Sequence, residues 1–164
     1  TDMAETLDVT MMIPNKFEPL RKHRWVFGIE GIDSYLMKTA ARPQIAQNEI
    51  TIEWINQKRY LAGKAESQPL NVVLYDPIAP SGAQQVMEWM RLHHEIVSGR
   101  AGYADFYKRD CEIKMLDPVG TVVQLWQLKG CFLTDSNFNE LDYSAADAME
   151  IALTIRFDTY ILQY

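Results

Sequence analysis

Apolar and polar residues alternate along much of the chain, which is the pattern of a strand with one buried face. The longest alternation runs from Met149 to Asp158, and Glu150, Thr154, Arg156 and Asp158 share its polar side. At about 3.3 Å per residue this segment spans about 30 Å. The pattern predicts a long antiparallel strand with one wet face, as in a closed barrel or in a wall that lines a water-filled space.

Shorter alternations predict further half-buried antiparallel strands. Their inward residues are Trp25, Phe27 and Ile29, then Ile50, Ile52 and Trp54, then Cys111, Ile113 and Met115. A longer strand is predicted over residues 121–133, and its apolar residues change side near Leu125 and Trp126, which indicates a bulge. Residues 134–148 are rich in Asp, Asn and Ser, which predicts a loop before the final long strand.

One segment has helical periodicity. Ser81 is a predicted N-cap, and the helix is expected to run to about Ser98. Its apolar arc covers more than half of the circumference, more than a small sheet alone would bury, and so indicates a neighbouring subunit. The arc consists of Val86, Met87, Trp89, Met90, Leu92, His93, His94, Ile96 and Val97.

Two adjacent histidines on this helix raise the question of a metal site. A zinc-binding helix needs ligands about one turn apart on the same face, whereas Glu95 points away from His93, and the remaining histidine is His23. We therefore interpret His93 and His94 as packed or interfacial side chains. We expect no bound metal.

No catalytic or cofactor motif is present. The eight glycines are scattered, so no phosphate-binding loop or dinucleotide fingerprint exists, and no nucleophile motif is found. Cys111 and Cys131 are expected to be reduced core thiols, with a disulfide as the less favoured alternative. The sequence therefore predicts a protein that is not an enzyme and has no cofactor.

Two segments look incompletely covered for a monomer. Residues 42–70 form a long predicted hairpin, with Lys58, Arg59, Tyr60, Lys64 and Gln68 near its tip. The chain ends on apolar residues 160–164, although termini are usually polar. Another copy of the chain would cover both segments.

Residues 1–22 are predicted to be an extended N-terminal arm that leads into the first strand. The basic run from Arg21 to Arg24 can be interpreted as a phosphate contact, but a solvated turn or an intersubunit ion pair is favoured on an acidic protein.

The composition of the chain narrows the possible classes of protein. The 164 residues suit one domain, and the net charge of −6 argues against a basic nucleic-acid-binding surface. No apolar run approaches the roughly 18 residues of a membrane span, and Asp2, Glu5 and Asp8 stand where a signal peptide would be basic. Membrane insertion and secretion are therefore not expected.

Several segments carry a family resemblance. RWVFGIEGIDSYLMKTAARPQ, at residues 24–44, resembles the first strand pair of the tail tube proteins of contractile-tailed bacteriophages. ITIEWINQKRYLAG, PLNVVLYDPIAPSGAQQVMEWM, LKGCFLTDSNF and IALTIRFDTYILQY follow in that family's order. The resemblance covers nearly all of the chain beyond the first twenty residues, and that family shares its fold with the tube proteins of type VI secretion systems and tailocins.

The resemblance implies a mainly β fold: a single tail-tube domain over residues 1–164, built as an antiparallel β-barrel or sandwich with one flanking α-helix at residues 81–98. It implies hexameric rings that stack into a hollow virion tube for viral DNA, with residues 42–70 reaching the adjacent ring. The implied partners are other copies of the chain, the tail sheath protein, and the baseplate and tail-terminating proteins. Assembly would take place in the host bacterial cytoplasm.

This resemblance selects the candidate functional residues. The expected inter-ring or intersubunit contacts are Arg42, Lys58, Arg59, Tyr60, Lys64, Trp89, His93 and Tyr164. The expected lumen-facing residues are Glu150, Thr154, Arg156 and Asp158, and the alternative is that these four lie on an ordinary outer surface. An acidic lumen would let DNA slide, because it would not exchange counterions with the phosphates.

Other functions remain open on the sequence. Within the same fold, the chain is alternatively a baseplate tube-initiator or a tailocin or type VI secretion tube subunit. A different class is a monomeric small-ligand-binding β-barrel with Trp25, Trp54 and Trp126 around its pocket, although core packing explains these aromatic residues more simply.

Overall fold

The computed structural model describes residues 16–79 and 81–164. The first fifteen residues of the predicted N-terminal arm lie outside the described residues, and the rest of the arm is mostly exposed and without helix or strand. The elements, in chain order, are β1 (Trp25–Ile29), η1 (Ser34–Leu36), β2 (Met37–Ala40), β3 (Ile45–Glu53), β4 (Lys58–Ser67), β5 (Leu70–Tyr75), α2 (Gly82–His93), α3 (Ala104–Tyr107), β6 (Arg109–Leu116), β7 (Val122–Asn137), β8 (Glu150–Arg156) and β9 (Thr159–Leu162).

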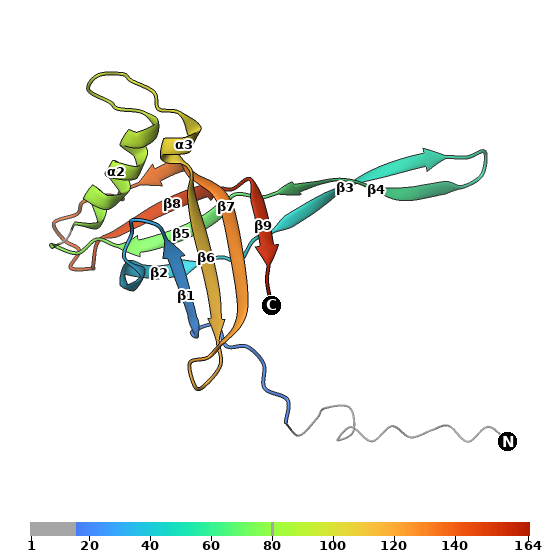
Figure 1. Ribbon diagram of the computed structural model, residues 1–164, viewed down its shortest axis with the longest axis horizontal. Helices are drawn as coiled ribbons and strands as arrows, with labels where there is room; N and C mark the ends of the chain where they lie inside the picture. The colour runs from blue at the N-terminus through green and yellow to red at the C-terminus, as the bar shows by residue number, and fades with distance from the viewer. Residues whose placement is uncertain (1–15, 80) are drawn as a thin grey trace.

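The body is an antiparallel sheet folded over on itself. Its strand order is β1-β6-β7-β8-β5-β2, and β9 also pairs with β7. The first half of β7 pairs with β6 and β9, and its second half pairs with β8. In Figure 1 the strands β6 and β7 cross over β5 and β8, so that the two halves of the sheet face each other as a sandwich. The predicted mainly β fold with a flanking helix is confirmed.

Strand β7 can belong to both halves because it is bent. Extra residues interrupt its pairing at Val123, at Lys129–Gly130 and at Thr134. The bulge predicted near Leu125 and Trp126 lies two residues earlier, at Val123, since both named residues pair in regular register with β6. The apolar pattern changes side there because Leu125 lies opposite Lys114, outside the main core, whereas Trp126 lies opposite Ile113.

The core fills the space between the two halves of the sheet. The apolar side of the longest predicted strand is buried as expected, with Ile151, Leu153 and Ile155 at most 2% exposed. Phe27, Ile113 and Cys111 face them from the other half. The local alternation was a reliable guide here because each of these strands has one face against the core.

Helix α2 packs at one end of the sandwich, where Val86 and Trp89 join the core. Ser81 caps it as predicted, since its side chain accepts a hydrogen bond from the Gln84 amide at 3.4 Å. The predicted end at Ser98 is wrong. The chain leaves the helix after His93 and turns back through residues 95–102, a turn closed by hydrogen bonds from the Glu95 amide to the Arg100 carbonyl and from the Gly102 amide to the His93 carbonyl. The short helix α3 had no counterpart in the sequence prediction.

The β3–β4 hairpin stands away from the body as a separate two-stranded sheet (Figure 1). The long excursion expected over residues 42–70 is therefore confirmed as a hairpin. However, β3 is not half-buried as predicted, because all of its residues from Gln47 to Glu53 are exposed. The alternation of Ile50, Ile52 and Trp54 marks an apolar face that nothing in the described chain covers.

Candidate assembly surfaces

The projecting hairpin has two chemically different faces. Directly opposed residues share a face of an antiparallel pair, so Ile50 with Leu61 and Ile52 with Arg59 form one side. Glu49, Thr51 and Glu53, with their β4 partners, form the other side. The first side is mainly apolar and the second mainly polar. The hairpin is thus amphipathic without having a core of its own.

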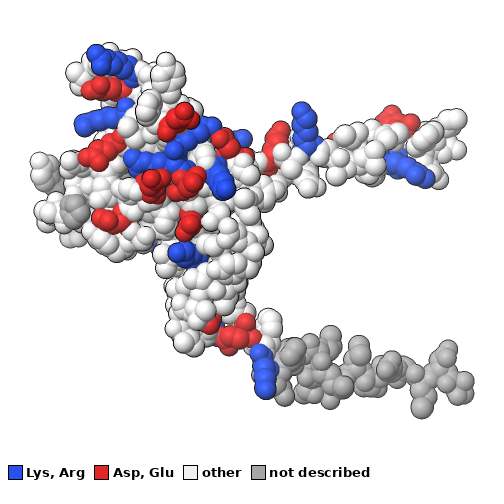
Figure 2. Space-filling view, viewed as in Figure 1, with Lys and Arg blue, Asp and Glu red and all other residues white. Residues whose placement is uncertain are grey.

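The exposure of the apolar side is large. Ile50, Leu61 and Trp54 keep 50%, 52% and 64% of their surface in solvent. A two-stranded hairpin is at best marginally stable alone in water. Figure 2 shows the hairpin projecting from the body, with uncharged surface between its few charged side chains. A surface with these properties is suited to contact with another protein.

The structure places the predicted hairpin contacts at three levels. Lys58, Arg59 and Tyr60 lie next to the tip, where Lys58 pairs with Glu53 at 3.7 Å. Lys64 lies farther down β4, close to the bulge between Gln47 and Glu49, and Gln68 is at the base, so the expectation that these two lie near the tip is wrong. Arg42 is also at the base, where its guanidinium lies 3.4 Å from Oε1 of Gln124.

A second surface is the outer face of the β2-β5-β8 half of the sheet. Glu150, Thr154 and Arg156 alternate with the buried residues of β8 and therefore lie together on this face, each half-buried by its neighbours. Tyr75 lies opposite Glu150, and Asn71 lies opposite Thr154. Three of the four predicted lumen-facing residues thus share one polar surface.

Charges on this face are paired. Lys38 of β2 donates a hydrogen bond to the Glu150 carboxylate, and this bond raises the pKa of Lys38 above its usual 10.5, more than burial lowers it. Lys38 also lies over the Tyr75 ring, 5.7 Å from the ring centroid. The face therefore presents mixed charge and not the uniformly acidic surface that the net charge suggested.

Asp158, the fourth predicted residue, is not part of this surface. It follows β8 at the turn into β9, and its carboxylate binds Nζ of Lys108 at 2.5 Å. Its amide donates to the Lys129 carbonyl at 3.0 Å. Asp158 therefore fastens the bend of β7 to the start of β6, which is a role within the subunit.

Helix α2 contributes one of the two predicted contact residues to the surface. Trp89 is only 1% exposed, and its indole N–H donates to the Tyr107 carbonyl at 2.6 Å. Its side chain is thus a core residue, and the prediction that it contacts a neighbour is wrong. His93 is exposed, with its ring centroid 4.5 Å from that of Tyr107.

Arg109 closes the space beside Trp89. Its guanidinium lies 5.1 Å from the Trp89 ring and donates to the Glu30 carbonyl at 2.8 Å. Burial lowers the pKa of Arg109 below its usual range. These bonds hold α2, β6 and the end of β1 together.

The apolar C-terminus runs beside β7. The Leu125 amide donates to the Tyr164 carbonyl at 3.0 Å, and the Gln163 amide donates to the Leu125 carbonyl at 2.9 Å. Tyr164 remains 61% exposed, and Ile161 and Leu162 are also exposed. The backbone of the terminus is therefore fixed while its side chains remain available for contact.

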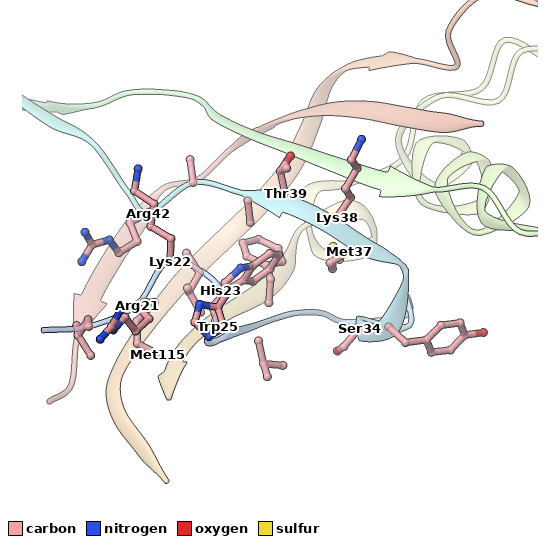
Figure 3. A pocket seen from close by; sticks show the side chains of 17 residues that line it. Arg21, Lys22, His23, Trp25, Ser34, Met37, Lys38, Thr39, Arg42 and Met115 are labelled. Carbon is pink, nitrogen blue, oxygen red and sulfur yellow. The ribbon is translucent and has the colours of Figure 1, made fainter. Parts of the chain in front are cut away.

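A third surface was not anticipated from the sequence. A groove of about 1050 Å³ opens between β1 and β2, which do not pair with each other (Figure 3). Trp25, Met37 and Met115 line its apolar part, and Lys22 and His23 lie at its rim. Sequence periodicity could not show this groove, because its walls come from segments that are far apart along the chain.

The structure also bears on the ligand-binding alternative. Trp25 lines the groove, Trp54 is at the hairpin tip, and Trp126 donates to Oε1 of Gln124 at 3.1 Å. The three tryptophans thus do not surround a common pocket. Cys111 and Cys131 are buried free thiols, and the hydrogen bond between them together with burial raises the pKa of Cys111.

Residues 16–79 and 81–164 lack two further features. This part of the chain contains no cluster of three or more His, Cys, Asp or Glu side chains placed to hold a metal ion. It also contains no helix with the length and apolar character needed to cross a membrane.

Comparison with known proteins gives no sequence family but a clear fold. No protein-family model and no curated protein sequence matches the chain. Among solved structures, a chain from the tube-terminating cap of the anti-feeding prophage is 18% identical, with a TM-score of 0.69 over 96% of this chain and 99% of that chain. A chain from the sheath/tube terminator of the extracellular contractile injection system PVC is also 18% identical, with a TM-score of 0.68 over 91% and 99%.

A more distant structure extends this group. Hcp1 from Flavobacterium johnsoniae is 8% identical, with a TM-score of 0.51 over 85% of this chain and 94% of that chain. All three matches span nearly the full length of both chains, and all are too low in identity to show more than the fold. The chain has the tube-like fold found in contractile injection systems.

Proposed function

We propose that this chain is a structural, non-enzymatic subunit of the inner tail tube of a contractile phage particle. Hexameric rings of the chain stack into a hollow tube inside the sheath, between the baseplate and tail-terminating proteins. The observation that carries the proposal is the uncovered apolar face of the β3–β4 hairpin, on a chain with the fold of contractile-system components. The location that follows is the virion, after assembly in the host bacterial cytoplasm.

In this proposal the hairpin is the inter-ring connector. Its apolar side packs against a subunit of the next ring, while Lys58, Arg59 and Tyr60 at the tip and Lys64 along β4 supply polar contacts. Arg42 at the base, His93 on α2 and Tyr164 at the C-terminus contact neighbouring subunits. Burial of the apolar side removes the exposed surface that a free subunit keeps in water.

The outer face of the β2-β5-β8 half forms the lumen wall. Glu150, Thr154 and Arg156 are the lumen-facing residues. Because Lys38 neutralises Glu150, DNA meets alternating charges there, and no row of basic side chains is available to exchange counterions with the phosphates. DNA therefore passes through without specific binding.

A capping or tube-initiating subunit of the same fold is the second candidate, because the structures reported above come from a tube-terminating cap and a sheath/tube terminator. A tube subunit stacks on itself without limit, whereas a terminal subunit forms single rings. Negative-stain electron microscopy and light scattering of the concentrated protein separate these outcomes. A protein that stays monomeric, even with baseplates added as seeds, would contradict both.

A pair of variants tests the hairpin directly. Ile52→Asp places a charge on the apolar side and is expected to abolish stacking, while the unfolding midpoint of the subunit in urea stays unchanged because the hairpin lies outside the core. Thr51→Asp places the same charge on the polar side of the same strand and is expected to leave stacking intact. Equal loss of tubes in both variants would mean that stacking does not depend on the apolar side of the hairpin.

A further inference from the structure

The groove between β1 and β2 has the chemistry of a binding site for an acidic, extended segment. Its floor is apolar and reaches the core, since Phe27 is fully buried and Ile113 is 2% exposed. The charged side chains that line it are all basic, namely Arg21, Lys22, Lys38 and Arg42. No acidic side chain is among its lining residues, although the chain as a whole has a net charge of −6.

Some of this basic charge is available. Lys38 is bound to Glu150, Arg42 lies beside Gln124, and Arg21 has Glu18 at 3.6 Å. Among residues 16–79 and 81–164, Lys22 has no salt-bridge partner. Figure 3 shows Lys22 and His23 close to each other among the side chains that line the groove.

The walls of the groove are also free strand edges. In the described chain β1 pairs only with β6, and β2 pairs only with β5. Each strand therefore has one row of backbone N–H and C=O groups without a strand partner. An extended segment that enters the groove gains backbone hydrogen bonds in addition to side-chain contacts.

We propose that residues 1–13 of a second copy of this chain occupy the groove. The segment reads TDMAETLDVTMMI and carries the carboxylates of Asp2, Glu5 and Asp8 without any basic side chain. From Leu7 to Ile13 its odd positions are Leu, Val, Met and Ile, the alternation that suits a strand with one apolar face. The apolar side meets the floor, and the carboxylates meet the basic rim.

We assign the arm in the groove to a second copy because the arm of the chain that forms the groove leads away from it. Leu20 to His23 form part of the wall, and Figure 1 shows residues 16–19, before them, leading away from the body. Pro19 disfavours a helical conformation of the residue before it, and so disfavours a tight reversal back into the same groove. This inference rests on the proposed assembly of identical subunits, in which each arm fills the groove of a neighbour.

Zero-length crosslinking tests the contact in the native protein. Equal amounts of ¹⁴N- and ¹⁵N-labelled subunits are mixed while dispersed, assembled, and treated with a carbodiimide, which joins a carboxylate to a lysine amine that it contacts. Tryptic digestion releases residues 1–16 as one peptide. Mass spectrometry is expected to find this peptide joined to Lys22, with about half of the linked pairs mixed in isotope if the arms exchange between copies at random.

The outcomes separate the inference from the proposed function. Tubes that form without such links, or with links that are always isotopically pure, would overturn the inference and leave the tube function standing. Absence of any ring or tube would instead overturn the function, and the inference with it. Isotopically mixed links support the inference.

A matched set of variants measures the contribution of the charges. Neutralising the arm, with Asp2→Asn, Glu5→Gln and Asp8→Asn together, is expected to raise the protein concentration needed for assembly about tenfold, the effect of three exposed ion pairs. The control neutralises three exposed acids elsewhere, Asp105→Asn, Glu140→Gln and Asp147→Asn, and is expected to leave that concentration unchanged. An equal effect in both sets would show that only net charge matters and would overturn the inference.

Discussion

The bend in β7 depends on Gly130, and replacing this residue tests how the two halves of the sheet are joined. Gly130 has a φ of 69°, in the left-handed region. A methyl group added there would run into the Asp158 carboxylate, with the Asp158 Cγ only 2.9 Å away. Gly130→Ala therefore combines backbone strain with a steric clash, and Asp158 can yield only by loosening its bond to Lys108.

The magnitude follows from these two contributions. The left-handed conformation costs a non-glycine residue about 1–2 kcal/mol. Overpacking of a filled site adds about 1–3 kcal/mol. The free energy of unfolding of Gly130→Ala should thus fall by about 2–5 kcal/mol, a large part of the stability of a domain.

Gly99 provides a matched control. It has the same φ of 69°, but nothing lies within 4 Å of an added Cβ. Gly99→Ala should therefore show only the backbone cost of about 1–2 kcal/mol. Urea unfolding of dispersed subunits, followed by tryptophan fluorescence, gives both values. If the two variants lost the same stability within about 0.5 kcal/mol, which is the usual scatter of such comparisons, the clash with Asp158 would be disproved.

Three further predictions concern the core, the outer sheet face and the thiols. Ile155→Ala should lower the free energy of unfolding by about 2–5 kcal/mol because Ile155 is fully buried, whereas Thr154→Ala on the wet side of the same strand should change it by less than about 1 kcal/mol; equal losses in urea unfolding would contradict the assigned faces. Glu150 raises the pKa of Lys38, so the ion pair between them stabilises the fold below pH 10.5, and this stabilisation is lost as the pH rises through the raised pKa. In Glu150→Gln the pKa of Lys38, read from NMR titration, should fall back toward 10.5. Because its pKa is raised by its partner and by burial, Cys111 should not react with a thiol reagent at pH 8 until urea unfolds the subunit, and rapid labelling of the folded protein would refute this.

The parts of the fold that depend on local pattern were predictable from the sequence. A strand with one face against a core must alternate, and β1, β6 and β8 do so with buried Phe27, Ile113 and Ile155. The start of α2 was predictable because capping by Ser81 involves residues only three apart in the chain. The hairpin was predictable as an excursion too long for a compact domain.

The parts that depend on distant contacts were not predictable. The apolar pattern of α2 continues past His93, but the core ends at Trp89, so the chain turns away and leaves Ile96 and Val97 in solvent. Burial of Trp89 depends on the Tyr107 carbonyl, which α3 supplies from elsewhere in the chain. Alternation could not distinguish a strand whose apolar face meets the core from one whose apolar face is uncovered, which is why β3 looked half-buried.

The candidate sites also include features that follow from local sequence pattern and features that depend on distant contacts. Glu150, Thr154 and Arg156 could be assigned to one face because period two fixes it, but pairing of Lys38 with Glu150 required the register of β2, β5 and β8. Asp158 continued the alternation in the sequence and yet left the surface, because the strand ends at Arg156 and the chain turns into β9. The groove between β1 and β2 had no sequence signal, since it exists only where two edges fail to pair.

The distribution of apolar surface is consistent with a subunit that folds alone and, under the proposed function, is driven to assemble. The body buries its own core between the two halves of the sheet, so its stability does not require a neighbour. The hairpin instead leaves Ile50, Ile52 and Leu61 about half exposed. Completing the burial of these side chains yields on the order of 1 kcal/mol for each, half of the value for a fully exposed one.

This burial free energy is too small for one hairpin to hold two subunits together against the entropy lost on association. In the proposed rings, several hairpins would engage one neighbouring ring together, and after the first has bound, the others would lose little further entropy. Growth from an existing ring is therefore favoured over pairing of free subunits.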